Sequence, residues 1–270
     1  MMTAFKDLFG PGKPLIAVLH LLPLPGSPLY DGSMKHVYEQ ALRELEIFKR
    51  CAVQGVIVEN FRDTPFYPGR VPAETVASMS AVAREVVRAA GVPVGINVLR
   101  SDAESAVAIA TAAGAEFIRV NVHMSAVVSE QGIIQGMSHL SVRLRAALKS
   151  QVLIFADVGV KHAAALADRG LRSETQDLAE RGLADAVIVS GARTGAETRV
   201  EDVDVVRAAT TLPVLIGSGV TPENVPNLYS KVDGLIVGTY FKKDGVGDNL
   251  VEEARVQRFA RSLSELSGPV

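Results

Sequence analysis

The sequence predicts a single α/β domain over residues 1–270, folded as a closed (β/α)8 barrel of the TIM type. Eight short apolar runs alternate with segments of helical periodicity, which is typical of a parallel α/β fold. The length of 270 residues suits a barrel, which needs about 250. The last two apolar runs end in small residues, as in TIM barrels that bind a phosphate. An open doubly wound sheet is the alternative, but no glycine-rich dinucleotide fingerprint follows the first run.

The predicted strands are apolar on both faces instead of alternating. This is expected of parallel strands that lie between a barrel core and covering helices. They cover residues 15–19, 55–58, 92–97, 116–120, 152–156, 186–189, 214–216 and 235–237.

Helical periodicity fills the intervals between these strands. Residues 34–50 place Val37, Ala41 and Leu45 on one face, and Ser101 is a candidate N-cap for the third helix. The predicted helices cover residues 34–50, 72–90, 102–113, 139–148, 173–181, 200–209, 222–229 and 249–266. Their alternation with the strands predicts eight βα units with no interrupting linker.

Composition and charge argue against several classes of protein. With 48% hydrophobic and 21% charged residues, the chain has enough apolar material for a core, so disorder is not expected. A net charge of −2 offers no electrostatic basis for nucleic-acid binding, and no nucleic-acid partner is predicted. The single cysteine, Cys51, cannot form an internal disulfide, and the apolar run at residues 15–24 is too short to span a bilayer. We therefore expect a cytoplasmic protein.

Small residues after the last three predicted strands indicate anion binding. Thr221 and Pro222 suit a helix start after the seventh strand, and N–H groups at helix starts attract phosphate without a charged side chain. The alternative for residues 190–195 is a simple turn. The predicted phosphate-binding residues are Gly191, Thr194, Gly195, Gly217, Ser218, Gly219, Gly238 and Thr239.

Two carboxylates at strand ends are the candidate acid/base pair. Glu59 follows residues 55–58, and Asp157 follows residues 152–156. An unpaired carboxylate at the end of an apolar strand is costly, so each must be paired, neutral or functional. The structural alternative for Glu59 is an ion pair with Arg62, Arg119 or Lys161.

Two further residues are candidates for catalysis. Lys161 could act as a Schiff-base nucleophile, because a desolvated lysine can have a lowered pKa; the alternative is a charge partner for Asp157. His20 ends the first strand, where the alternative is a histidine that bonds a neighbouring strand end.

The remaining polar residues at strand ends are candidate substrate contacts, because the carboxyl ends of barrel strands meet at one mouth. They are Asn60, Asn97, Arg119, Asn121 and His123. Imidazole and carboxylate side chains together could bind zinc or manganese, but no HxH or HExxH spacing is present. We therefore predict no required cofactor, with a divalent metal as the alternative; its ligands would be His20, Glu59, His123 and Asp157.

Long motifs resemble those of one protein family in the same order along nearly the whole chain. They are HLLPLPGSP, GVIVEN with DTPF, GINVLRSDAESAVAIA, FIRVNV, ADVGVKHA, AVIVSGARTG, PVLIGSGVTPENV and GLIVGTYFK. These strings resemble the BtpA family, which is similar to ribulose-phosphate-binding TIM barrels. The chain departs from the family pattern at Phe61, where a small residue is more usual, and at residues 124–126, where a glycine-containing loop is expected.

The resemblance leaves two functions open. The namesake of the family implies a role in photosystem I biogenesis or stability as a peripheral membrane protein. Relatives from non-photosynthetic organisms resemble enzymes of sugar metabolism. We predict an enzyme, forming a homo-oligomer, that acts on a phosphorylated sugar or ribonucleotide-like compound by isomerisation, lysis or glycosidic cleavage. The alternatives are a non-catalytic assembly factor, which would use the barrel as a scaffold, and a regulator that binds a phosphometabolite.

Overall fold

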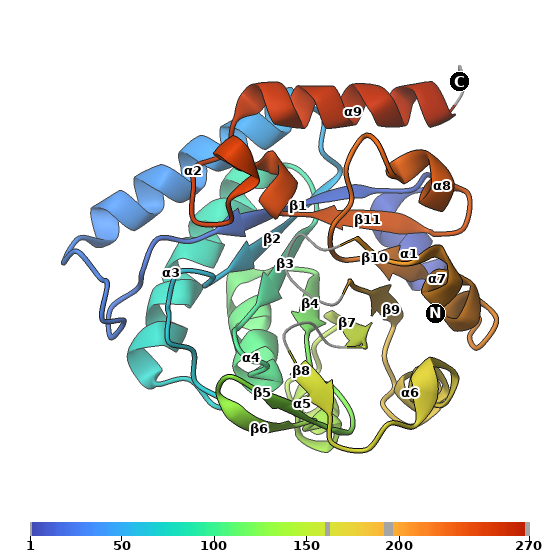
Figure 1. Ribbon diagram of the computed structural model, residues 1–270. Helices are drawn as coiled ribbons and strands as arrows, with labels where there is room; N and C mark the ends of the chain where they lie inside the picture. Colours follow the sequence, from blue (N-terminus) through green and yellow to red (C-terminus); the bar gives the residue numbers. More distant parts are fainter. Residues whose placement is uncertain (1, 160–162, 192–196, 268–270) are drawn as a thin grey trace.

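Eight parallel strands close into a barrel in the computed structural model, which describes residues 2–159, 163–191 and 197–267 (Figure 1). Around the barrel the strands are β1 (Leu15–His20), β11 (Gly234–Val237), β10 (Val214–Ile216), β9 (Ala186–Val189), β7 (Leu153–Val158), β4 (Phe117–Val120), β3 (Val94–Asn97) and β2 (Gly55–Glu59). Each neighbouring pair is parallel, so all eight carboxyl ends open at one mouth. The predicted fold class and all eight predicted strands are confirmed.

The strands are buried on both faces, as their continuous apolar sequence predicts. Side chains that point inward, including Phe117 and Phe155, form a core inside the barrel. The helix α1 (Met2–Phe9), which was not predicted, places Phe5 against Phe155 with ring centroids 5.8 Å apart. Gly95 leaves space for the Phe117 ring in this core, since a Cβ at position 95 would lie 2.2 Å from that ring. The barrel core is therefore continuous with the α1 side chains at its base.

The covering helices follow the predicted order. They are α2 (Met34–Arg50), α3 (Ala73–Ala90), α4 (Ala103–Ala113), α5 (Ser138–Ala147), α6 (Gly170–Glu180), α7 (Val200–Arg207), α8 (Val225–Tyr229) and α9 (Glu253–Ser267). They surround the barrel (Figure 1). Each contributes apolar side chains to the hydrophobic core or packs them against it. None of the helices in the described ranges has the length and apolar character needed to cross a lipid bilayer.

Helix α6 begins three residues before the predicted position 173, and α9 begins four residues after the predicted position 249. Two further predicted starts, those of α4 and α8, are corrected by local hydrogen bonds. The N-cap of α4 is Asp102, not Ser101: the Asp102 carboxylate accepts from the Ser105 N–H, while the Ser101 hydroxyl pairs with the Val122 backbone. Helix α8 begins three residues after the predicted position at Pro222, because a turn precedes it. In this turn the Thr221 N–H donates to Asn224 Oδ1, and the Thr221 hydroxyl accepts from the Glu223 N–H.

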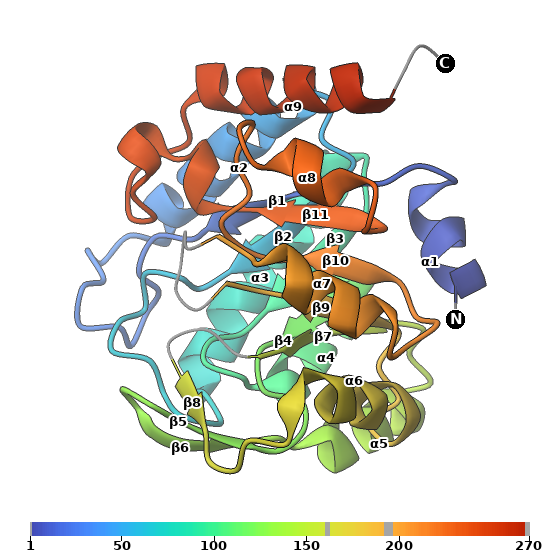
Figure 2. The same cartoon turned by 45° about the vertical axis from the view of Figure 1, so that its right-hand side comes forward.

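A small antiparallel sheet beside the mouth was not predicted. It consists of β5 (Ala126–Ser129), β6 (Gly132–Gln135) and β8 (Ala163–Ala165), in the order β6-β5-β8 (Figure 2). Among the described residues, Val122, Val127 and Ile134 form a small buried cluster here, against which Ala163 packs. Such short, half-exposed strands carry little periodic signal in the sequence.

Candidate functional site

A cavity of about 520 Å³ opens at the carboxyl ends of the barrel strands. It brings together nine of the residues predicted for the site: His20, Glu59, Arg119, Asn121, Gly217, Ser218, Gly219, Gly238 and Thr239. Its lining also includes residues that were not predicted as site residues: Phe61, Phe66, Arg100, Glu130, Tyr240 and Arg255. One cavity thus joins carboxylate and imidazole groups to the glycine-rich strand ends.

Glu59 and His20 face each other across the β1 and β2 strand ends. Glu59 Oε1 lies 3.8 Å from His20 Nε2, and Glu59 Oε2 accepts a hydrogen bond from Asn97 Nδ2. Both side chains are buried, with exposed fractions of 6% for Glu59 and 4% for His20. Asn97 therefore orients the carboxylate without contributing to the cavity lining.

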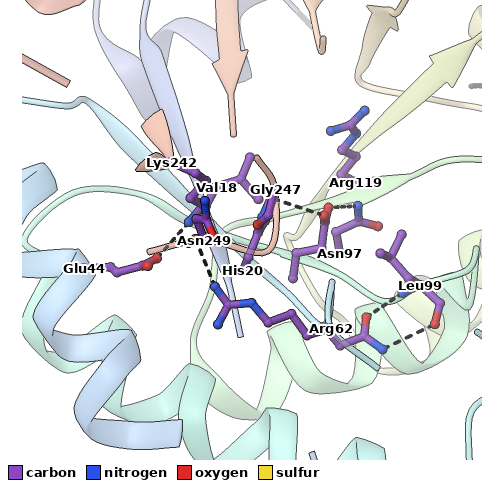
Figure 3. A network of polar contacts seen from close by, with 12 residues as sticks. Val18, His20, Glu44, Arg62, Asn97, Leu99, Arg119, Lys242, Gly247 and Asn249 are labelled. Carbon is purple, nitrogen blue, oxygen red and sulfur yellow. Dashed lines mark hydrogen bonds and ion pairs between the residues drawn. The ribbon is translucent and has the colours of Figure 1, made fainter. Parts of the chain in front are cut away.

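The backbone around His20 determines which ring nitrogen can act as a base. Nδ1 lies 2.8 Å from the Gly247 carbonyl, which only accepts, so Nδ1 carries a proton and Nε2 has the lone pair of the neutral ring (Figure 3). The ring stacks on Phe61 with centroids 4.0 Å apart. A Cβ at Gly238 would lie 3.1 Å from Nε2. Glycine at this position thus leaves space beside the basic nitrogen.

Asp157 is bound to Arg119 in a buried ion pair. Its two oxygens accept from Arg119 Nε at 3.2 Å and Nη2 at 2.9 Å, and Oδ2 also accepts from Asn121 Nδ2 at 2.8 Å. Burial opposes the charge of Arg119, but the neighbouring carboxylates of Asp157 and Glu59 outweigh it and raise its pKa above the usual value. Arg119 is therefore a fixed positive charge beside Glu59, and Asp157 holds it there.

We expect Asp157→Asn to lower the free energy of unfolding by about 3 kcal/mol, because it leaves Arg119 buried without its paired charge. The exposed pair of Asp204 with Lys231 is the control: Asp204→Asn should cost less than about 1 kcal/mol. Chemical denaturation of both variants measures this. Equal losses would show that the buried pair is not a stabilising unit.

Several predicted substrate contacts lie outside the cavity lining. Asn60 instead joins two loops: its Oδ1 accepts from the Leu99 N–H at 2.7 Å, and its Nδ2 donates to Asp63 at 3.2 Å. Asp157 and Gly191 are also absent from this lining, and Asp157 borders a separate cavity of about 280 Å³. Lys161, Thr194 and Gly195 lie outside the described residues.

His123 is buried away from the cavity, with 1% of its surface exposed. Its Nε2 donates to the Gly182 carbonyl at 2.8 Å. Burial lowers its pKa below the usual value, so the neutral ring is favoured in the folded chain. The predicted role in substrate binding has no support from this position.

The lowered pKa of His123 predicts a loss of stability in acid. The unfolded histidine binds a proton below about pH 6.5 and the folded one does so only at lower pH, so stability falls as pH drops through that window. The slope can reach about 1.4 kcal/mol per pH unit. We expect His123→Gln to reduce the difference in unfolding free energy between pH 7 and pH 5, measured by denaturation, and the exposed His139→Gln to preserve it.

The loop after β10 is shaped by close contacts with the rest of the site. A Cβ at Gly217 would lie 2.4 Å from Ile188 and 3.0 Å from Arg119 Nη2, so only glycine fits. The Ser218 carbonyl accepts from the Thr198 hydroxyl at 3.1 Å, and Gly219 has a φ of 65°, which favours glycine. This loop therefore lies against the Arg119 guanidinium.

The alternative of a divalent metal finds no ready ligand set in the parts of the chain that the structure describes. His123 donates to Gly182, and Asp157 is held by Arg119, so neither joins His20 and Glu59. No group of three or more histidine, cysteine or carboxylate side chains suited to a metal occurs among the described residues.

Solved structures share the barrel at low sequence identity. Thiamine phosphate pyrophosphorylase from Pyrococcus furiosus superposes with a TM-score of 0.58 at 12% identity, over 95% of this chain and 97% of its own. N-(5'-phosphoribosyl)anthranilate isomerase from Pyrococcus furiosus gives a TM-score of 0.56 at 15% identity, over 93% and 98%. At these identities the similarity shows the fold alone.

Sequence comparison identifies the family. A protein from Thermococcus kodakarensis is 42% identical over 254 residues, which cover 94% of this chain and 96% of the relative. The photosystem I biogenesis protein BtpA from Synechocystis is 41% identical over 254 residues, covering 94% of this chain and 88% of the relative. A sequence model of the BtpA family matches residues 11–265. The chain therefore belongs to the BtpA family.

Proposed function

We propose that this chain is an enzyme that acts on a phosphorylated sugar or ribonucleotide-like small molecule. The observation that carries the proposal is the single cavity, which joins the glycine-rich ends of β10 and β11 to the buried Glu59 and His20. The phosphate would lie over Gly217–Gly219, Gly238 and Thr239, where many TIM barrels hold one. The two similar structures are named for thiamine phosphate and for a phosphoribosyl compound, and these names are consistent with this class of ligand.

Glu59 and His20 would transfer protons at the other end of the substrate. With Nδ1 bonded to the Gly247 carbonyl, His20 can accept a proton at Nε2, 3.8 Å from Glu59 Oε1. One group would remove a proton from a substrate carbon or hydroxyl and the other would return it, which suits isomerisation, carbon–carbon lysis and glycosidic cleavage. The fixed charge of Arg119 would stabilise negative charge that develops on the substrate.

Asp157 takes a different part in this proposal from the acid/base role that the sequence suggested. Both of its oxygens are engaged by Arg119, and one also by Asn121. We assign it the positioning of Arg119. The role of Lys161, and the self-association predicted from sequence, stay predictions.

Proton transfer can be tested before the substrate is known. Incubation with a panel of phosphorylated aldoses, ketoses and ribose phosphates in D₂O, followed by proton and phosphorus NMR, reports both product formation and exchange of substrate hydrogen with solvent. We expect exchange or turnover with at least one member. A panel that yields no turnover, no exchange and no binding would contradict the proposal.

A non-catalytic assembly factor is the competing function, and the 41% identity to a photosystem I biogenesis protein is the observation that favours it. Such a factor would associate with a membrane complex through its surface and would tolerate changes inside the cavity. Loss of binding to a membrane complex on surface mutation, with no effect of Glu59→Gln, would support this function over the enzyme.

A further inference from the structure

We propose that Arg255 is the charged group that recognises the phosphate of the substrate. The assignment rests on the proposed function, because Arg255 lines the same cavity beside Gly219, Gly238 and Thr239. No strand end contributes this residue: it comes from the first turn of α9, at the carboxyl end of the chain. The ligand chemistry is a phosphate dianion, carried as a monoester on the substrate.

The fold brings α9 across the strand ends that form the predicted phosphate site. Figure 2 shows the helix lying over α8 and β11, and Phe259 packs against Tyr240 and Phe241 of the segment after β11. Arg255 lies one turn before Phe259 and is half-buried. The apolar face of α9 therefore anchors the helix and places Arg255 at the edge of the cavity.

Tyr240 holds the guanidinium in one orientation. Arg255 Nε donates to the Tyr240 carbonyl at 2.5 Å, and the guanidinium carbon lies 4.5 Å from the centroid of the Tyr240 ring. These contacts occupy the Nε edge and one face of the group. Within the part of the chain that the structure describes, the two terminal nitrogens have no hydrogen-bond partner, and their planar fork matches two oxygens of a phosphate.

The charge balance of the cavity singles out Arg255 among its cations. Arg119 is paired with Asp157 at 2.9 Å, and Arg100 lies 3.7 Å from Glu130. Within residues 2–159, 163–191 and 197–267, no Asp or Glu oxygen comes within 4.0 Å of the Arg255 guanidinium, while its neighbour Arg258 is paired with Glu223 at 2.6 Å. The charge of Arg255 also acts on the Glu223 carboxylate at longer range, but that carboxylate is paired with Arg258. An anionic ligand would therefore provide Arg255 with the direct ion-pair partner that the described protein groups do not.

The backbone N–H groups of the loop after β10 are not sufficient to bind a phosphate, so a charged side chain is needed as well. The Gly217 N–H donates to the Val189 carbonyl at 2.9 Å, so it is already used by the barrel. Fewer backbone donors are then available to a phosphate than the glycine-rich sequence suggests. A fixed guanidinium adds charge-assisted hydrogen bonds, which are about twice as strong as neutral ones.

Phosphate-dependent stabilisation tests the assignment without any assay of turnover. A ligand that binds only the folded chain raises its stability in proportion to the logarithm of ligand concentration over Kd. We would measure denaturation midpoints against inorganic phosphate, ribose 5-phosphate and unphosphorylated ribose at constant ionic strength, for the native chain, Arg255→Met and Arg258→Met. Methionine preserves the apolar stem of the side chain, and Arg258, one turn further along α9 and outside the cavity lining, is the matched control.

We expect ribose 5-phosphate and inorganic phosphate to stabilise the native chain and the Arg258→Met variant equally. In Arg255→Met, Kd for both ligands should rise at least about tenfold. Unchanged affinity in Arg255→Met would overturn the assignment and leave the proposed phosphate site standing. If inorganic phosphate stabilised the native chain and ribose 5-phosphate did not, the site would not be one for the phosphate group of a substrate, and the assignment would be overturned. If neither ligand stabilised the native chain, the Arg255 assignment and the proposed phosphate site would both be overturned. Binding without turnover would count against the proposed enzymatic function alone.

Discussion

Glu59→Gln is expected to lower kcat by about 10²- to 10⁴-fold, the usual contribution of a general acid or base. Glutamine has nearly the size of glutamate, and its carbonyl oxygen can still accept from Asn97 Nδ2. The change therefore removes the titratable oxygen that faces His20 Nε2 while it preserves the packing around it. Turnover, or hydrogen exchange in D₂O with a substrate from the panel, measures the effect.

Two comparisons make the Glu59 result specific. Glu46→Gln changes an exposed carboxylate on α2 and should leave kcat unchanged. The stabilisation of Glu59→Gln by ribose 5-phosphate should equal that of the native chain, because the phosphate end of the cavity is intact. If kcat in Glu59→Gln stays within twofold of native, the proton-transfer role is refuted.

Lys242→Met is expected to lower the free energy of unfolding by about 3–5 kcal/mol, the cost of breaking a buried ion pair by removing one partner. Lys242 is fully buried, its Nζ lies 2.9 Å from Glu44 Oε2, and it donates to the Val18 carbonyl at 3.4 Å (Figure 3). Burial lowers the pKa of Lys242, but the Glu44 carboxylate opposes this effect. Without Lys242 the Glu44 charge would remain buried and uncompensated.

The double variant Glu44→Met with Lys242→Met separates the ion pair from the packing. Replacing both charges by apolar groups of similar size is often neutral or stabilising, so most of the loss should be recovered. Lys35→Met, which removes a cation exposed on the same helix as Glu44, should change stability by less than about 1 kcal/mol. Denaturant midpoints of the native chain, Lys242→Met, the double variant and Lys35→Met measure these differences. A double variant no more stable than Lys242→Met would mean that lost packing, not the unpaired charge, causes the loss of stability.

The same buried pair also bears on the proposed site. Lys242 begins the segment between η1 (Thr239–Phe241) and α9, and Gly247 in that segment bonds His20 Nδ1. Arg62 Nη2 donates to the Asn249 carbonyl at 3.1 Å and so ties the segment to the β2 end. The position of the His20 ring therefore depends on groups well outside the cavity.

Local sequence patterns were sufficient for the barrel strands but not for the small sheet. A strand such as residues 186–189 is continuously apolar, so its burial on both faces can be recognised without its neighbours. In β5 and β8 the exposure is mixed, and Val127 pairs with Ala165 from a segment far along the chain. Such pairing depends on chain topology, which a local pattern does not contain.

The candidate site divides in the same way. Glu59 and Asp157 are equivalent in sequence, since each ends an apolar strand. They differ in the structure because Arg119 on the adjacent strand binds Asp157 at both oxygens, whereas Glu59 faces His20 and Asn97. Arg255 ends no strand, and only the packing of α9 reveals it.

The sequence by itself determined the class of fold, the family and which strand ends carry polar or small residues, because these depend on periodicity and composition along the chain. The tertiary structure alone decided which of those side chains share one cavity, which carboxylate binds Arg119 and which histidine lines the cavity. The physical reason is that burial and charge pairing arise between strands and helices distant in sequence, and these interactions set the protonation and orientation of each group.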